Sequence, residues 1–420
     1  MSFSDNKFNI HEKNRPKNNL FEEDEEILET LNISSNIYKN NVNTEINKLL
    51  SKENSNENIN SQCDIGKREF ESDFLEKKNK YIKKYKSDDS RLYGITFQSS
   101  SKSDLINIAV SSLNINTNNH ISILSFSQED IFNEDDNIDI INNNINSINN
   151  DSICLKSQVQ CEFPVSSILF SPHEQNKNLL ISTSDILRLY SFEEDKLSLK
   201  ADFKKRIKDY CGPLTSCDWS HSNNSIIGVC SIDTTCAIWD LNKFQVRYMI
   251  IAHDKEVFDI SLGPDEFTFM STGADGSVRL FDSRSANSSS IIFETRDKSP
   301  MTRLKWNLVN PNFILAVIVD KNEIYILDQR KLTSPYAILK VHTNVVNNAI
   351  WAPESNTNLI SVSDDKSALL WDIYCDSDQP EEYIMKYDAQ SEIENVSWGN
   401  MTQNWVGIID GNQAEILRIQ

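Results

Sequence analysis

Residues 214–240 read LTSCDWSHSNNSIIGVCSIDTTCAIWD, and residues 345–372 read VVNNAIWAPESNTNLISVSDDKSALLWD. Both segments contain three short apolar runs, rich in β-branched and aromatic residues, that are separated by turn residues. In both, an acid stands in the turn before the third run, and Trp followed by Asp ends that run. Runs of this length and composition predict β-strands. A unit that recurs at a fixed interval predicts a repeat architecture.

The large residue that ends the third run recurs along the chain at a regular interval. Its positions are Tyr190, Trp239, Phe281, Leu327, Trp371 and Leu417, with spacings of 49, 42, 46, 44 and 46 residues. This interval is typical of WD-repeat blades. An earlier unit covers residues 92–124 and ends 66 residues before Tyr190. The excess of about 20 residues over one repeat matches the Asn-rich segment 129–151, which we interpret as a surface insert between two repeats.

The seven units predict an all-β fold, a seven-bladed WD-repeat β-propeller over residues 80–420. Seven four-stranded blades of about 45 residues use about 315 residues. The segments 1–79 and 129–151 account for the remainder, so no second folded domain is required. The last unit ends with the chain, and its outer strand must therefore come from elsewhere. We expect residues 80–86 to supply it, because closing the ring removes exposed strand edges.

The acidic residues are concentrated in a few segments of the chain, and the net negative charge argues against nucleic acid as a partner. Of 420 residues, 42 are Lys or Arg and 62 are Asp or Glu, which gives a net charge of −20. Residues 1–79 form an Asn-rich acidic tail that we expect to be disordered. The insert has seven acids and no base, and residues 364–394 have ten acids and two Lys. This acidity opposes direct nucleic-acid binding and favours a basic partner for the last two blades.

Other features of the sequence predict a soluble intracellular protein. No apolar run approaches the roughly 20 residues of a membrane span, and the first ten residues lack the apolar core of a signal peptide. The eight Cys are scattered without a C-x-x-C pair. That pattern indicates reduced thiols and neither a disulfide framework nor a zinc site. We expect no bound metal and no cofactor.

Two sets of residues resemble catalytic groups but have the spacing of a structural network. The first set is His342, Ser361, Asp365 and Trp371, and the second is His253, Ser271 and Asp275, with Phe281 in place of Trp. In the WD-repeat tetrad, Asp, His, Ser and the indole N–H form a buried hydrogen-bond chain, which satisfies polar groups that are costly to bury alone. The sequence also lacks a phosphate-binding loop, a zinc-protease motif and a nucleophile elbow. We therefore predict no catalytic residues and no enzymatic activity.

Two tetrapeptides stand just past the third strands of adjacent repeats: Phe281-Asp-Ser-Arg284 and Leu327-Asp-Gln-Arg330. A guanidinium group at such a place can donate two parallel hydrogen bonds to carboxylates or carbonyls of a partner. The alternative is an ion pair within the chain, with the preceding acid or a neighbouring loop. Both alternatives stay open, and the candidate partner-binding residues are Asp282, Arg284, Asp328 and Arg330.

Several segments resemble one particular family of WD-repeat proteins. The segments are Leu214–Trp219, Ser231–Cys236, Ile251–Val257, Gly273–Val278, Trp351–Pro353 and Ala414–Arg418. Their order and spacing are similar to those of the WD-repeat adaptor family of the plant Transparent Testa Glabra and anthocyanin-regulating proteins. The animal member of that family is the DYRK-kinase-binding, cullin-associated WD-repeat scaffold. The resemblance is dense over residues 210–420, thinner over 80–210, and absent from the tail and the insert.

The resemblance implies a non-enzymatic scaffold that docks a DYRK-type kinase or transcription regulators. It also implies an alternative, the substrate receptor of a cullin-based ubiquitin ligase, in which W-D-x-R boxes contact the damage-binding adaptor. The box arginines fall on Arg284 and Arg330, where Phe281 and Leu327 replace the Trp of the family. We expect protein partners, no direct nucleic-acid or membrane binding, a monomer, and a location in cytoplasm and nucleus.

Overall fold

The computed structural model describes residues 82–87, 90–99, 105–114, 119–127, 153–203, 212–285, 289–373, 383–399 and 404–419. The chain divides into residues 1–74 and 75–420, and every described residue belongs to the second part. The predicted tail (1–79) and the predicted insert (129–151) therefore lie outside the described residues. The predicted domain boundaries stay predictions.

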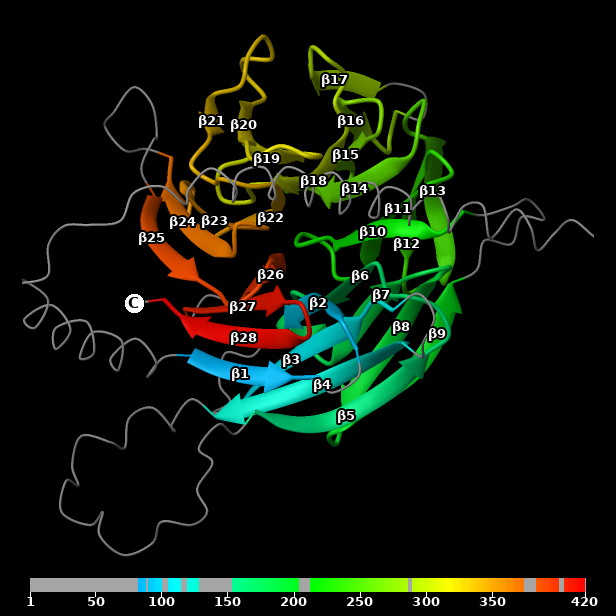
Figure 1. The fold of residues 1–420 in the computed structure, drawn as a ribbon. Coiled ribbons are helices and arrows are strands. Elements are labelled where there is room, and N and C mark those ends of the chain that lie inside the picture. Colours follow the sequence, from blue (N-terminus) through cyan, green and yellow to red (C-terminus); the bar gives the residue numbers. More distant parts are fainter. Residues whose placement is uncertain are drawn as a thin grey trace, which may run out of the picture. The chain divides into compact units, whose positions relative to one another are not determined.

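The described residues form seven four-stranded antiparallel sheets, the blades of a β-propeller (Figure 1). This result confirms the predicted fold class. Blade 1 consists of β2 (Leu92–Phe97), β3 (Leu105–Ser112), β4 (Asn119–Ser127) and β5 (Cys154–Cys161). Blade 2 consists of β6 (Ser167–Phe170), β7 (Leu179–Thr183), β8 (Leu187–Glu193) and β9 (Lys196–Phe203). Blade 3 consists of β10 (Leu214–Trp219), β11 (Ile226–Ser231), β12 (Thr235–Asp240) and β13 (Gln245–Ile251).

Blades 4 to 7 follow in the same order. Blade 4 consists of β14 (Val257–Leu262), β15 (Thr268–Gly273), β16 (Ser277–Asp282) and β17 (Ser289–Glu294), and blade 5 of β18 (Met301–Trp306), β19 (Phe313–Ile318), β20 (Ile324–Asp328) and β21 (Ala337–Leu339). Blade 6 consists of β22 (Val346–Trp351), β23 (Asn358–Ser363), β24 (Ser367–Asp372) and β25 (Tyr383–Asp388). Blade 7 consists of β26 (Ile393–Trp398), β27 (Trp405–Asp410), β28 (Gln413–Arg418) and β1 (Ile82–Lys86). Within the described ranges, the one helical element is the 3₁₀ turn η2 (Glu174–Asn176), and no helix there is long and apolar enough to cross a membrane.

The first strand of each blade lies toward the middle of the ring and contacts the first strands of both neighbouring blades. Strand β2 contacts β6 on one side and β26 on the other, which closes the ring (Figure 1). Second strands are covered on both faces: all six residues of β11 and all six of β19 are buried. Continuous apolar runs are typical of strands that are covered in this way.

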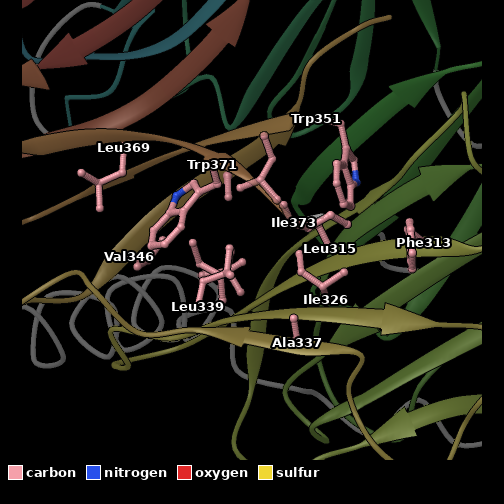
Figure 2. Close-up of a cluster of buried hydrophobic side chains, with 14 residues drawn as sticks. Phe313, Leu315, Ile326, Ala337, Leu339, Val346, Trp351, Leu369, Trp371 and Ile373 are labelled. Carbon is pink, nitrogen blue, oxygen red and sulfur yellow. The ribbon is translucent and has the colours of Figure 1, made fainter. Parts of the chain in front are cut away.

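Adjacent blades pack against each other through apolar layers. Figure 2 shows one layer, in which Leu315, Ile326 and Leu339 of blade 5 share an apolar cluster with Val346 and Trp371 of blade 6. Equivalent clusters join the other blades, including one in which Phe126 of blade 1 meets Trp405 of blade 7. A single blade cannot bury both of its faces. The stability of each blade therefore depends on its neighbours in the closed ring.

The N-terminal part of the described chain closes the ring, as the sequence predicted. Strand β1 pairs antiparallel with β28, with Ile82 opposite Leu417 and Tyr85 opposite Ala414. Lys84 of β1 forms an ion pair with Glu415 of β28, whose side chain is fully buried. Tyr387 of blade 6 also donates a hydrogen bond to Glu415, 2.6 Å from its Oε2. Blades 6 and 7 and the closing strand therefore meet at one buried carboxylate.

The predicted position of the Asn-rich insert between two repeats is wrong. Residues 129–151 lie in the chain between β4 and β5, and these two strands belong to the same sheet. The insert therefore interrupts blade 1 between its third and fourth strands. The error arose because β5, with the sequence CLKSQVQC, has no apolar run and none of its residues is buried. Because β5 lacks an apolar run, the sequence pattern of this repeat ends at the third strand.

Candidate functional site

The tetrad of blade 6 is a continuous chain of hydrogen bonds. His342 Nδ1 lies 2.8 Å from Asp365 Oδ2, and His342 Nε2 lies 2.7 Å from Ser361 Oγ. Trp371 Nε1 donates to the same Ser361 hydroxyl at 2.8 Å. Two backbone N–H groups also donate to Asp365, that of Thr343 in the loop before β22 and that of Ser367 at the start of β24. The four side chains with tetrad spacing thus lie together in one blade.

Burial decides what this tetrad can do chemically. Ser361 is 0% exposed and His342 is 2% exposed, so a substrate cannot reach the hydroxyl while the blade is intact. Burial lowers the pKa of His342, although the facing Asp365 opposes this change. Burial alone would raise the pKa of Asp365, but hydrogen bonds from Ser367 and the facing His342 lower it. A neutral imidazole held by an ionised carboxylate, without access from solvent, stabilises the blade rather than catalysing a reaction.

Blade 4 contains the second network. His253 Nδ1 lies 3.0 Å from both carboxylate oxygens of Asp275, and His253 Nε2 lies 2.8 Å from Ser271 Oγ. Phe281 occupies the position of the tetrad Trp and stacks on Phe269, with ring centroids 4.9 Å apart. This blade therefore keeps the His–Asp contact and replaces the indole hydrogen bond with apolar stacking.

Arg279 completes the network of blade 4, although its spacing in the sequence does not indicate this role. Its Nη2 atom donates to Asp275 at 2.8 Å and to Asp254 at 2.9 Å. Hydrogen bonding from His253 and Ser277 holds the pKa of Asp275 well below its ordinary value, against the opposing effect of burial. Within the described part of the chain, no group of three or more His, Cys, Asp or Glu side chains is placed to hold a metal ion.

The two D-x-R tetrapeptides have the same geometry in blades 4 and 5. Arg284 Nε donates to Asp282 Oδ1 at 2.9 Å, and its Nη2 donates to Oδ2 at 2.6 Å. Arg330 makes the same two bonds to Asp328, also at 2.9 and 2.6 Å. Hydrogen bonds from Arg284 lower the pKa of Asp282 to about 2. Both pairs therefore stay ionised at neutral pH.

These ion pairs leave the arginines accessible to a partner. The side chains of Arg284 and Arg330 are 59% and 62% exposed. Each guanidinium is held by two bonds to a carboxylate two residues earlier, so its orientation is fixed before any partner arrives. Of the two alternatives from the sequence, the intramolecular ion pair is present in both blades. Because the outer side of each guanidinium stays exposed, this ion pair does not exclude partner binding.

Further residues that the sequence pattern does not identify lie beside Arg284. The ring of Phe267, in the turn between β14 and β15, has its centroid 4.8 Å from Cζ of Arg284 and 5.4 Å from Cζ of Arg247. Arg247 belongs to β13 of blade 3 and also pairs with Glu266. No spacing rule finds this cluster, because its members lie in a turn of one repeat and the outer strand of another.

Blade 5 carries Arg330 at the equivalent position, and Tyr336, just before β21, is 45% exposed and packs against Phe313. We call the whole set the arginine surface, and its members are Arg247, Phe267, Arg284, Arg330 and Tyr336. Arginine and aromatic side chains are enriched at the energetically important positions of protein interfaces. The composition of the arginine surface is therefore typical of a protein-binding surface.

Comparison with known proteins agrees with this architecture. The repeat family described as "WD domain, G-beta repeat" matches residues 203–240, 244–282 and 333–372. A Dictyostelium discoideum protein, "DDB1- and CUL4-associated factor 7 homolog", is 38% identical over 262 residues, which cover 61% of this chain and 80% of the relative.

Two yeast proteins are also similar to this chain. WD repeat-containing proteins of Schizosaccharomyces pombe and Saccharomyces cerevisiae are 35% and 34% identical, and the matches cover 56% and 50% of their lengths. The Dictyostelium relative supports the cullin-associated part of the predicted family. The plant part of the resemblance stays a prediction.

Proposed function

Because this chain belongs to the WD-repeat family of the Dictyostelium DDB1- and CUL4-associated factor 7 homolog, we propose that it is a non-enzymatic protein-interaction scaffold. Its partners are a kinase of DYRK type or transcription regulators, as the resemblance of the sequence implies. The scaffold acts as a monomer in cytoplasm and nucleus and needs no cofactor.

One observation carries this proposal: two adjacent blades present the same exposed, pre-oriented arginine. In contrast, the His, Ser and Asp side chains that resemble catalytic groups are committed to the interior of the blades. An arginine that is already held by its Asp loses little side-chain entropy when a partner binds. Its exposed edge can still donate to a carboxylate or carbonyl of the partner. Neighbouring aromatic side chains supply apolar contact area beside these charges.

The second candidate function is that of a substrate receptor for a cullin-based ubiquitin ligase. The Dictyostelium relative is named as a factor associated with DDB1 and CUL4, and this chain carries Arg284 and Arg330 at the box positions. The family's Trp is replaced by Phe281 and Leu327, which are 1% and 3% exposed. These replacements change the core of each blade rather than its surface. The Asp–Arg pair of each box is intact, and the arginine of each pair is exposed.

Charge reversal at the arginine surface tests the ligase candidate. We expect the double variant R284E/R330E to bind purified DDB1 at least about tenfold more weakly than the wild type, because truncation of central interface arginines commonly costs this much or more. The reversed side chains would also face Asp282 and Asp328 with like charge. Binding is measured by biolayer interferometry at two salt concentrations, since the loss should be larger at low salt.

The matched control is K255E/R296E, which makes the same change in net charge. These two exposed residues lie after the outer strands of blades 3 and 4, away from the third-strand ends that carry the arginine surface. The control should bind DDB1 like the wild type. Equal binding by R284E/R330E and the wild type would reject the ligase candidate and leave the scaffold proposal standing.

A further inference from the structure

The outer strand of blade 6 is unusually exposed. In β25, five of the six residues are exposed, and three consecutive ones are large and apolar: Tyr383, Ile384 and Met385, which are 40%, 53% and 47% exposed. In the outer strand of blade 3, β13, exposed and half-buried residues alternate. Alternation is the pattern of a strand with one packed face, so β25 departs from it by exposing apolar side chains at successive positions.

Strand β25 also has an open edge. Among the described strands it pairs with β24 alone, and it lies at the outer side of its blade (Figure 1). Edge strands in soluble proteins usually carry protective charges. The one Lys of this strand, Lys386, pairs with Asp388 of the same strand, at 2.9 Å. The apolar end of β25 therefore lacks a charge of its own, and an exposed apolar cluster of this kind is typical of an interaction site.

The charge around this strand selects the kind of partner. The described residues 364–373 and 383–394 contain six acids and two Lys. At one end of the strand, Tyr383 lies opposite Trp371, which directly precedes Asp372. Asp388 ends the strand, and the exposed Glu392 follows it. Acids thus flank the apolar residues at both ends.

We propose that β25 docks a segment of a partner protein that carries both basic and large apolar side chains. The apolar side chains would cover Tyr383, Ile384 and Met385, and the basic ones would meet the flanking acids. This inference rests on the proposed scaffold function and assigns one partner to blade 6. The arginine surface of blades 3 to 5 remains available for another partner.

Charge excludes the other occupants of this surface. A second copy of the chain would place two acidic rims against each other, which costs several kcal/mol in unfavourable pairings. Nucleic acid and anionic membranes carry the same sign of charge as the rim. The chain's own residues 1–80 hold 16 acids and 12 bases, so the tail has the wrong net charge. A basic partner is the occupant that the electrostatics favour.

The test uses the full-length chain and three fluorescent eight-residue peptides. The peptides alternate Lys with Val, Glu with Val, and Lys with Ser. We expect the Lys-Val peptide to bind at least about tenfold more tightly than the other two, as measured by fluorescence anisotropy, because it alone carries both features. The variant Y383S/I384S/M385S should lose at least about tenfold in affinity for it, and D388K/E392K, which keeps the apolar residues, should lose a similar factor.

The matched control is M249S/I251S/I291S, which removes three exposed apolar residues from the outer strands of blades 3 and 4. This control and R284E/R330E should both bind the Lys-Val peptide like the wild type, which separates this inference from the ligase candidate. Equal binding by Y383S/I384S/M385S and the wild type would overturn the proposal. So would equal binding of the Lys-Ser peptide, or a wild-type dimer that the substitutions on β25 convert to a monomer.

Discussion

A chain that begins at residue 88, without the closing strand β1, should not form a stable propeller. Removal of β1 exposes the edge of β28 and leaves the buried carboxylate of Glu415 without its ion-pair partner Lys84. Removing one partner of a buried ion pair costs about 3–5 kcal/mol. We take the lower end of that range, because Lys84 is 38% exposed. Loss of the half-buried Ile82 and Tyr85 adds about 1 kcal/mol each.

The sum of about 5 kcal/mol is a large part of the 5–15 kcal/mol by which domains are usually stable. We therefore expect the truncated chain to aggregate or to melt at least about 10 °C below the full-length protein. Differential scanning fluorimetry and size-exclusion chromatography measure both outcomes. The control chain begins at residue 80, retains β1, and should melt with the full-length protein. If the chain that begins at residue 88 has the same melting temperature as the full-length protein, ring closure by β1 does not stabilise the fold.

The variant D365A should destabilise blade 6 strongly, because the Asp365 side chain is only 9% exposed. Asp365 accepts hydrogen bonds from the side chains of His342 and Ser367 and from two backbone N–H groups. Its removal leaves these donors without an acceptor, and each unsatisfied buried polar group costs about 1–3 kcal/mol. We expect a loss of about 3 kcal/mol in the free energy of unfolding, measured by urea denaturation at neutral pH.

The control for this prediction is D254A. Asp254 also belongs to an ion pair, with Arg279, but its side chain is 86% exposed. Exposed ion pairs contribute about 0–1 kcal/mol, so D254A should stay close to the wild type. A loss below about 1 kcal/mol for D365A would mean that the tetrad does not stabilise the blade, and the structural interpretation of His342 and Ser361 would then need revision.

The repeat architecture was visible in the sequence because inner strands carry continuous apolar runs. Spacing between residues such as Trp239 and Trp371 located the blades, and the missing strand of the last repeat identified residues 80–86 as its donor. Outer strands are harder to predict from the sequence, because they are half exposed and need no continuous apolar run. Strand β5 has no such run, so the sequence predicts the insert between two blades, whereas the structure has it within blade 1.

The candidate site residues also fall into two groups, those that spacing within one repeat predicts and those that it does not. The tetrads follow from spacing within one repeat, so their members could be named in advance. Arg279 pairs with two acids from different turns, and Phe267 meets arginines of two different blades. Such contacts arise from the packing of one blade on another, which no periodicity in the sequence records. The sequence also does not show that the apolar end of β25 is exposed. This exposure follows from the structure, in which β25 has fewer half-buried residues than β13 does.

The central claim, that this propeller is a protein-binding scaffold, is tested most directly by purifying the full-length chain from its native cells at near-physiological salt. Size-exclusion chromatography and quantitative mass spectrometry then identify what elutes with it. The scaffold account predicts near-stoichiometric protein partners, with a kinase or transcription regulator among them. A chain that elutes alone, with no partner above trace amounts, would contradict the account.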